Sequence, residues 1–258
     1  MRSRSGKVVA VVVLVVVALS AGCATMGLVE TIESLLNKIK ELLTAKKWDE
    51  ALIRVAEVIR RDPTQWRAYL YGAQAYIGKA EWGQALTHAR KVFEMAPRES
   101  ETLTTLGEAL LGAGTAALQR RAFGDAASHF VEYIKLRPAD AQGYLNAGRA
   151  FLGLGNWGEA ARVLVEGLGR ASDPATRSQL VQGLLEGGRQ ALARGEYRGA
   201  TSLLREYVRQ DPANVAAYLD LGKAYWGSGE RAEALGAFRR VLELAPQNEE
   251  ARRFLFGR

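Results

Sequence analysis

The six prolines of this 258-residue chain recur at a nearly regular interval, and each follows a stretch with the apolar periodicity of a helix. They are Pro63, Pro97, Pro138, Pro174, Pro212 and Pro246, separated by 34, 41, 36, 38 and 34 residues. Proline stops a helix because it lacks the amide donor and clashes with the carbonyl group one turn back. A period of roughly 20 to 50 residues is typical of a solenoid. The spacing therefore predicts short helices that stop at a set interval.

Composition favours helices over strands. Apolar residues make up 48% of the chain and charged residues 24%, which is typical of a folded protein rather than a disordered one. Alanine, leucine, arginine and glutamate dominate, and the only valine-rich stretch is 8–17. We expect an all-α fold.

Other residues keep the register of the prolines. One equivalent position is always alanine: Ala51, Ala85, Ala126, Ala160, Ala200 and Ala234. An aromatic residue stands three places before five of these alanines, at Trp48, Trp82, Phe123, Trp157 and Tyr197, with Arg231 before the sixth. Small residues let two helices approach closely, and we expect the aromatic rings to pack against the turn between the two helices of each repeat.

The pattern of the last repeat resembles the tetratricopeptide repeat family, a 34-residue helix-turn-helix unit. The matching residues are Tyr218, Leu221, Gly222, Tyr225, Ala234, Phe238 and Pro246. Six units can be set in register, at 32–65, 66–99, 107–140, 141–174, 181–214 and 215–248, and the first matches least well. The resemblance implies a right-handed α-solenoid. Residues 249–258 are expected to form a C-terminal capping helix in which Phe254, Leu255 and Phe256 fold back on the last repeat.

A longer duplication explains the irregular spacing. Residues 106–171 align without gaps to residues 180–245, and about a third of the aligned positions are identical. The additional stretches 100–106 and 175–180 are compatible with helix, so each is expected to lengthen the following helix by nearly two turns, roughly 10 Å. The six units therefore form three blocks of two, and the joints between the blocks are places to look for a partner.

Residues 1–22 have the pattern of a secretory signal peptide. Arg2, Arg4 and Lys7 precede an uncharged run that ends in small residues directly before Cys23, the only cysteine. This pattern resembles bacterial lipoproteins, which implies that Cys23 is lipidated and that 23–31 holds the lipidated N-terminus and the start of the first helix. The alternative is an uncleaved membrane span, since no charge occurs between Lys7 and Glu30. Either reading places the remainder outside the cytoplasm.

Charge and cysteine content limit the partners further. The formal net charge of +7 falls to +4 once the three basic residues of the signal are removed. An exported chain with this modest charge is not expected to bind nucleic acid, whereas acidic lipid headgroups or an acidic protein segment remain candidates. No cysteine follows position 23, so the mature domain is expected to depend on its packed core rather than on disulfides.

The residues do not predict an enzyme. His88 and His129 lack a second histidine or cysteine at metal-ligand spacing, and the glycine pairs at 112–114 and 153–155 lack the strand that precedes a phosphate-binding loop. We expect no catalytic residue, no metal, no cofactor and no small-molecule substrate.

The resemblance to tetratricopeptide repeats implies a concave groove lined by the first helices of the units. Position 5 of each unit supplies an apolar row: Leu36, Leu70, Leu111, Leu145, Leu185 and Leu219. Position 12 supplies a second apolar row: Leu43, Ile77, Leu118, Leu152, Leu192 and Trp226. Position 9 supplies a polar row between them: Lys40, Gln74, Thr115, Arg149, Arg189 and Lys223. These rows suit an amphipathic helix or an extended apolar segment with an acidic edge, although leucines at position 5 are equally compatible with helix packing.

The expected function is a non-enzymatic scaffold that docks envelope proteins at a membrane. By resemblance to sorted lipoproteins, Ala24 after the cysteine favours the outer membrane, facing the periplasm, over the inner membrane. Lipoproteins with about six such repeats include the pilotins that assemble type IV pilus secretins, which makes secretin assembly the leading specific hypothesis. The alternatives are an accessory subunit of an envelope enzyme, such as a peptidoglycan hydrolase adaptor, and a single-span tether.

Overall fold

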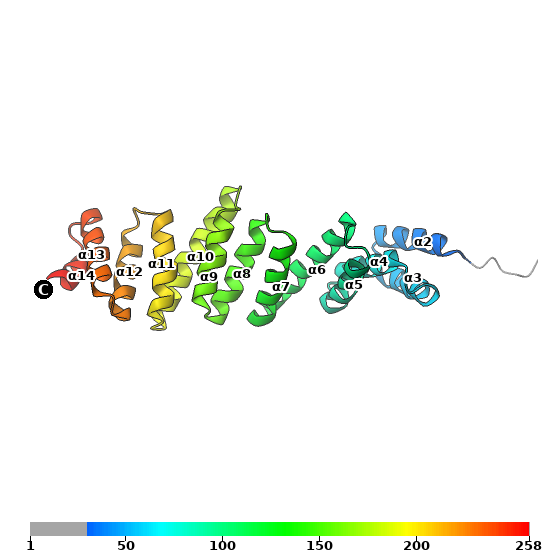
Figure 1. The fold of residues 1–258 in the computed structure, drawn as a ribbon, viewed down its shortest axis with the longest axis horizontal. Helices are drawn as coiled ribbons and strands as arrows, with labels where there is room; N and C mark the ends of the chain where they lie inside the picture. Colours follow the sequence, from blue (N-terminus) through cyan, green and yellow to red (C-terminus); the bar gives the residue numbers. More distant parts are fainter. Residues whose placement is uncertain (1–29, 258) are drawn as a thin grey trace, which may run out of the picture.

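A computed structural model describes residues 30–257, and within that range the chain forms helices and turns but no strand. The helices stack side by side into an elongated solenoid, with the first and the last described helices, α2 and α14, at opposite ends (Figure 1). Their bounds are α2 Ile32–Thr44, α3 Trp48–Arg61, α4 Trp66–Gly78, α5 Trp82–Met95, α6 Ser100–Gln119, α7 Phe123–Leu136, α8 Ala141–Leu154, α9 Trp157–Leu168, α10 Pro174–Ala193, α11 Tyr197–Gln210, α12 Val215–Ser228, α13 Arg231–Leu244 and α14 Glu249–Phe256. The all-α repeat fold predicted from the sequence is confirmed.

The prolines act through one repeated turn between helix pairs. After α3, α5, α7, α11 and α13, the residue before proline leaves the helical region, with φ between −129° and −143°, because proline disfavours an α conformation in the residue before it. The amide of the residue two places after proline then donates to the carbonyl oxygen of the residue before it, at 3.0 to 3.4 Å. Five prolines therefore end one helix pair and turn the chain into the next.

Pro174 has a different role, which corrects the expectation that all six prolines close a repeat. Helix α9 ends at Leu168, and Pro174 is the first residue of α10, after the N-cap Asp173, whose side chain accepts from the amide of Thr176 at 2.7 Å. The first helical position tolerates proline because its amide would have no partner within the helix. The expected unit 141–174 thus ends one residue inside the next helix.

The turn inside each helix pair contains one residue with positive φ. In the first three pairs this residue is Lys46, Ala80 or Arg121, with φ of 57°, 56° and 59°. In the last three pairs it is Gly155, Gly195 or Gly229, with φ of 73°, 73° and 87°. A side chain in the left-handed region costs about 1 kcal/mol or more, and glycine avoids this cost.

Glycine at position 8 of a unit, or at position 7 in unit 66–99, lets the two helices of one pair pack closely. A Cβ atom built at Gly72, Gly114, Gly148, Gly188 or Gly222 would lie 2.4 to 2.7 Å from a side chain of the following helix. Those side chains are His88, Phe130, Leu164, Leu204 and Phe238. The first pair differs, because Ile39 and Val55 occupy the corresponding positions within one buried cluster.

The aromatic residues that begin the second helices pack across to the following pair, and some also contact their own turn as expected: a Cβ atom at the turn residue Gly155 would lie 3.7 Å from Trp157, and Arg121 Cζ lies 5.8 Å from the centroid of the Phe123 ring. A Cβ atom at Gly78 would lie 2.6 Å from Trp48, and one at Gly153 would lie 2.4 Å from Phe123. Each ring therefore covers a glycine of the next first helix and ties one unit to its neighbour. Trp157 makes the same kind of contact with Gly199, in the second helix of the following pair.

Helices α6 and α10 have 20 residues each, so both have the lengthened N-terminal ends that the sequence predicts. The extension shifts the packing register at the joint. Gly78 and Gly153 are the thirteenth residues of their units, whereas the glycine beneath Trp82 is Gly112, the thirteenth residue of α6 counted from Ser100. The extension therefore changes which residue of α6 meets the aromatic ring of the preceding pair.

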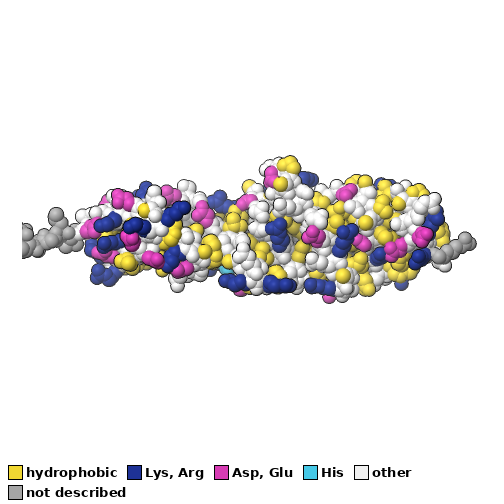
Figure 2. Space-filling view, turned by 180° about the vertical axis from the view of Figure 1, so that it is seen from behind, with side chains coloured by type: hydrophobic (Ala, Val, Ile, Leu, Met, Phe, Trp, Pro, Cys, Tyr) yellow, Lys and Arg dark blue, Asp and Glu magenta, His cyan; other side chains and the backbone are white. Residues whose placement is uncertain are grey.

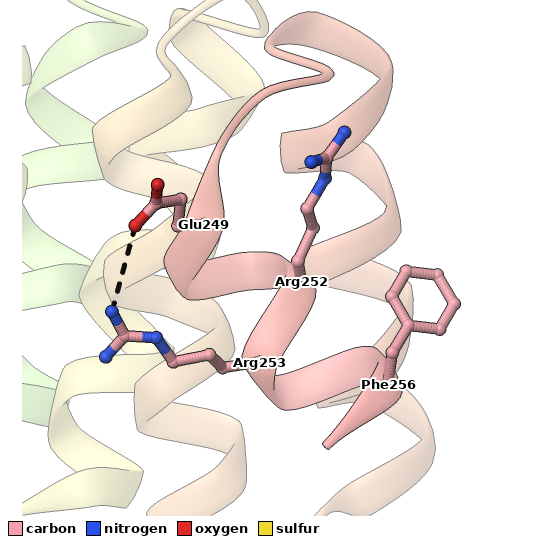
Figure 3. A pocket seen from close by; sticks show the side chains of 4 residues that line it. All are labelled: Glu249, Arg252, Arg253 and Phe256. Atoms are coloured by element: carbon pink, nitrogen blue, oxygen red, sulfur yellow. Dashed lines mark ion pairs between the residues drawn. The ribbon is translucent and has the colours of Figure 1, made fainter. Parts of the chain in front are cut away.

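The C-terminal cap folds back only in part. Phe254 stacks on Phe238 at 4.3 Å between ring centroids and meets the edge of Trp226 at 5.2 Å. Leu255 joins the same cluster, whereas Phe256 is 67% exposed, which contradicts the expectation for this residue. Figure 3 shows Arg252 and Phe256 on one side of α14, with Glu249 and Arg253 facing each other on the other side.

Surface composition differs between the ends of the solenoid. On the face seen in Figure 2, charged side chains gather over the N-terminal end and hydrophobic side chains are more frequent toward the C-terminal end. Across residues 30–257, every helix falls short of the combined length and apolar character that crossing a bilayer requires. The expected signal segment and Cys23 lie outside the described residues.

Candidate partner-binding groove

The position 5 row is mainly a packing row. Leu36, Leu70, Leu145 and Leu185 are 2%, 0%, 1% and 6% exposed, and Leu111 and Leu219 are half-buried. Side chains with so little exposed surface support the helix stack and cannot form the main contact surface for a partner. The expectation that all six leucines line an open groove is therefore corrected for these four.

The position 12 row lies closer to the surface. Leu43, Ile77, Leu118, Leu152 and Leu192 are half-buried, and Trp226 is 36% exposed. The Trp226 ring carries the guanidinium of Arg231, whose Cζ lies 3.8 Å from the ring centroid. This row therefore leaves apolar surface available along the first helices.

Some side chains of the position 9 row form an ion pair with a carboxylate and others do not. Arg189 Nε lies 2.9 Å from a carboxylate oxygen of Asp220, and Lys223 Nζ lies 2.8 Å from one of Glu250. The hydroxyl of Thr115 donates to the backbone oxygen of Leu111 at 2.7 Å. Lys40 is exposed and Gln74 is half-buried. Arg149 is exposed, and among residues 30–257 no carboxylate forms an ion pair with it.

Arg149 stands at the edge of a hollow of about 430 Å³ between α8 and α10. Its walls and floor are formed by Leu145, Arg149 and Leu152 of α8, Leu164 of α9, and Ser178, Gln179, Gln182, Gly183 and Glu186 of α10. Three of the predicted groove residues are thus brought together here. Gly183 and Gly187 add no side chain to the α10 side of the hollow. A Cβ atom at Gly187 would lie 2.4 Å from Leu152.

Neutral amides hold the guanidinium of Arg149 in place. One terminal nitrogen donates to Asn146 Oδ1 at 3.3 Å, and the other donates to Gln179 Oε1 at 3.2 Å, across the gap between α8 and α10. Asn146 is 8% exposed and also accepts from Gln142 at 3.2 Å. The cation is therefore positioned without being neutralised, which suits recognition of a carboxylate.

The α10 residues of the hollow were not predicted individually. Ser178, Gln179, Gln182, Gly183 and Glu186 lie outside the position 5, 9 and 12 rows. The signal that could have found them is the additional stretch 175–180, which marks a joint between blocks. A register counted from that stretch places Gln179 opposite Arg149.

A larger hollow, of about 770 Å³, lies beside α14 and is lined by Glu249, Arg252, Arg253 and Phe256 (Figure 3). One helix supplies all of its lining, so it is an open surface next to the cap. The α8–α10 hollow is walled by three helices and is the better formed site.

The two histidines are structural in character. His88 lies between the rings of Tyr69 and Tyr76, at 5.9 and 5.0 Å, and its Nδ1 lies 3.2 Å from the backbone oxygen of Gln84. Burial lowers the pKa of His88 below its ordinary value, and burial followed by the charge of Arg90 lowers the pKa of His129. Among residues 30–257, no group of three metal-ligating side chains comes together. Nothing in this part of the chain points to catalysis.

Comparisons with known proteins give one consistent result. Residues 111–175 and 191–255 match two family models, each described as tetratricopeptide repeat. No curated protein sequence matches the chain.

One solved structure shares the fold at low identity, and two others are less similar. A structure of Naa15/Naa10 bound to HypK-THB is 17% identical, with a TM-score of 0.51 over 88% of this chain and 34% of that one. The chain thus spans about a third of the length of that relative. A tetratricopeptide repeat protein from Parabacteroides merdae is 12% identical, with a TM-score of 0.46 over 86% and 83% of the two chains. The protein YrrB is 15% identical, with a TM-score of 0.41 over 89% and 94%.

Proposed function

Because the chain belongs to the tetratricopeptide repeat family, whose members generally mediate protein–protein interaction, we propose that it is a non-enzymatic scaffold. Its concave groove binds a segment of a partner protein. The half-buried side chains at position 12 supply apolar contact, and the polar row at position 9 orients the segment. Interaction, rather than chemistry, is the task for which these side chains are suited.

The observation that carries this proposal is the hollow between α8 and α10. It combines a buried apolar floor, formed by Leu145 and Leu164, with an exposed cation that is held by two amides and lacks a carboxylate partner within residues 30–257. A side chain fixed before binding loses less conformational freedom when a ligand arrives. The site is therefore prepared for a partner that supplies the missing negative charge.

Location is proposed from the sequence alone. Residues 1–22 are an export signal, and Cys23 carries the lipid that anchors the scaffold at the outer membrane, facing the periplasm. The scaffold assists assembly of an envelope complex, with a type IV pilus secretin as the first partner to test. Function as an accessory subunit of an envelope enzyme, or as a single-span tether, would appear as another partner or as an unlipidated chain in the experiments below.

The binding proposal is tested by purifying the tagged chain from crosslinked envelopes. Arg149→Glu should abolish recovery of the main partner while helicity by circular dichroism stays unchanged, because the substituted side chain is exposed. Arg198→Glu, an exposed substitution on α11 outside the hollow, is the matched control, because Arg198 likewise forms no ion pair within residues 30–257, and it should retain the partner. Recovery of the partner with Arg149→Glu would show that this hollow is not its site.

The anchor is tested separately by metabolic labelling with a lipid precursor. Wild type should incorporate label and Cys23→Ala should not, since the thioether forms on that sulfur. An unlabelled wild type would reject lipidation and favour the tether.

A further inference from the structure

The helix extension at the joint between α8 and α10 alters which side chain faces Arg149. In the following pair, Arg189 is neutralised by Asp220, the sixth residue of α12 and of its unit. The sixth residue of unit 181–214 is Glu186, which would be the corresponding partner for Arg149. The residue that contacts Arg149 is instead Gln179, the sixth residue of α10 counted from its first residue, Pro174. A neutral amide has therefore taken the place of the carboxylate.

The displaced carboxylate lies in the same hollow. Glu186 is exposed and lines it together with Arg149, and its carboxylate accepts a hydrogen bond from Gln182 Nε2 at 2.9 Å. No lysine or arginine within residues 30–257 forms an ion pair with it. Seven residues separate Gln179 from Glu186, so the two ends of the hollow are about 10 Å apart along α10.

We propose that this hollow recognises an extended partner segment that carries an acidic and a basic side chain about three residues apart, with apolar side chains between them. The acid meets Arg149, the base meets Glu186, and the apolar side chains cover Leu145, Leu152 and Leu164. The proposal rests on the proposed function and names the chemistry of the partner at the same site.

The spacing follows from the size of the hollow. An extended chain rises about 3.3 Å per residue, so three residues span the roughly 10 Å between its charged ends. A helix covers the same distance with about seven residues, at a rise of about 1.5 Å per residue. A spacing of about three residues between the two charges therefore distinguishes an extended segment from a helix.

The inference is tested by selecting from a displayed library of random short peptides on the full-length chain in detergent. Wild type should enrich peptides with an acid and a base three residues apart, in one order along the chain. The double variant Arg149→Glu with Glu186→Arg should enrich the reverse order and should bind the wild-type consensus peptide at least about tenfold more weakly. A matched swap on α13, Arg240→Glu with Glu243→Arg, should leave the consensus unchanged.

The same consensus from wild type and the double variant would overturn the proposal, as would an uncharged consensus, charges seven residues apart, or no enrichment. The single variants Arg149→Gln and Glu186→Gln provide a second test if the double variant fails to fold. Each should lose the preference for one charge and keep the other. Loss of partner recovery with Arg149→Glu but an unaltered peptide consensus would reject this charge pairing while leaving the scaffold function intact.

Discussion

The N-terminal half of the solenoid, α2 to α7, and the C-terminal half, α8 to α14, solve the same packing problem with different residues. The hairpin turns of the N-terminal half place Lys46, Ala80 and Arg121 at positive φ, whereas the C-terminal half uses glycine at each equivalent position. Both histidines lie in the N-terminal half. Three cations of the position 9 row, Arg149, Arg189 and Lys223, lie in the C-terminal half.

The features that reduce stability lie in the N-terminal half, and the candidate binding site lies in the C-terminal half. The N-terminal half carries turn strain, which reduces its stability, and two histidines whose lowered pKa reduces its stability only as the pH falls below about 6.5. The C-terminal half has unstrained turns and the hollow between α8 and α10. A rigid platform lowers the cost of ordering a site, so the half with relaxed turns is the better place for one.

The largest expected effect comes from replacing the packing residues of the fifth helix pair, α10 and α11, with those of the first pair, α2 and α3. Gly188→Ile should lower the free energy of unfolding by about 3 kcal/mol, because a Cβ atom there would lie 2.6 Å from Leu204 Cγ. Adding Leu204→Val recreates the Ile39 and Val55 combination and should restore part of the loss. Urea unfolding followed by circular dichroism measures both.

The control for this exchange is Gly158→Ala on α9, where a Cβ atom would meet nothing within 4 Å. It should be neutral or stabilising by up to about 1 kcal/mol, since alanine favours helix over glycine. If the double variant is no more stable than Gly188→Ile, the first pair is not held by the pairing of these two positions.

A smaller effect is expected when the turn residues are exchanged between the halves. Ala80→Gly should stabilise the chain by about 1 kcal/mol, and Gly229→Ala should destabilise it by a similar amount, because only glycine adopts positive φ without steric cost. Thermal and urea unfolding of the two variants check the opposite signs. Equal effects of the same sign would contradict a difference in turn strain between the halves.

The smallest effect is a pH dependence confined to the N-terminal half. Burial favours neutral His88 in the folded state, so the unfolded chain binds more protons as the pH falls through about 6.5. Stability should therefore be greatest above that pH and should decrease progressively toward the lowered pKa of the folded state. Urea midpoints at about pH 7.5 and about pH 5.5 should differ less for His88→Gln with His129→Gln than for wild type.

This pH window lies above the range in which ordinary carboxylates titrate, about pH 4. An unchanged pH dependence in the double histidine variant would therefore assign the effect to other groups. A larger pH dependence in that variant would contradict the direction of both pKa shifts.

The fold could be predicted from the sequence because the residues that indicate it act on their immediate neighbours in the chain. Proline acts on the residue before it and on the helix it ends, so the intervals between prolines predicted the helix pairs. Pro174 is the exception, and its role in starting α10 depends on Asp173 as the N-cap beside it. Residue type alone did not distinguish a proline that follows a turn from one that begins a helix.

The candidate site was accessible only in part because burial depends on the neighbouring units. Leu145 and Arg149 are four residues apart on one helix, yet Leu145 is 1% exposed and Arg149 faces solvent. The resemblance to tetratricopeptide repeats implied that both lie in the groove, without ranking their depth. Gln179, rather than Glu186, lies opposite Arg149 because of the way α10 packs on α8. The periodicity of a single helix gives no information about this packing.

The central claim is that the partner binds in the C-terminal half, in the hollow between α8 and α10. A photo-crosslinking amino acid placed at Gln182 in the hollow, at Thr115 in the same polar row of the N-terminal half, or at Arg162 outside the groove tests it most directly. Crosslinking to the partner should be strong from Gln182, weak from Thr115 and absent from Arg162. Crosslinks from Thr115 or Arg162 with none from Gln182 would contradict the claim.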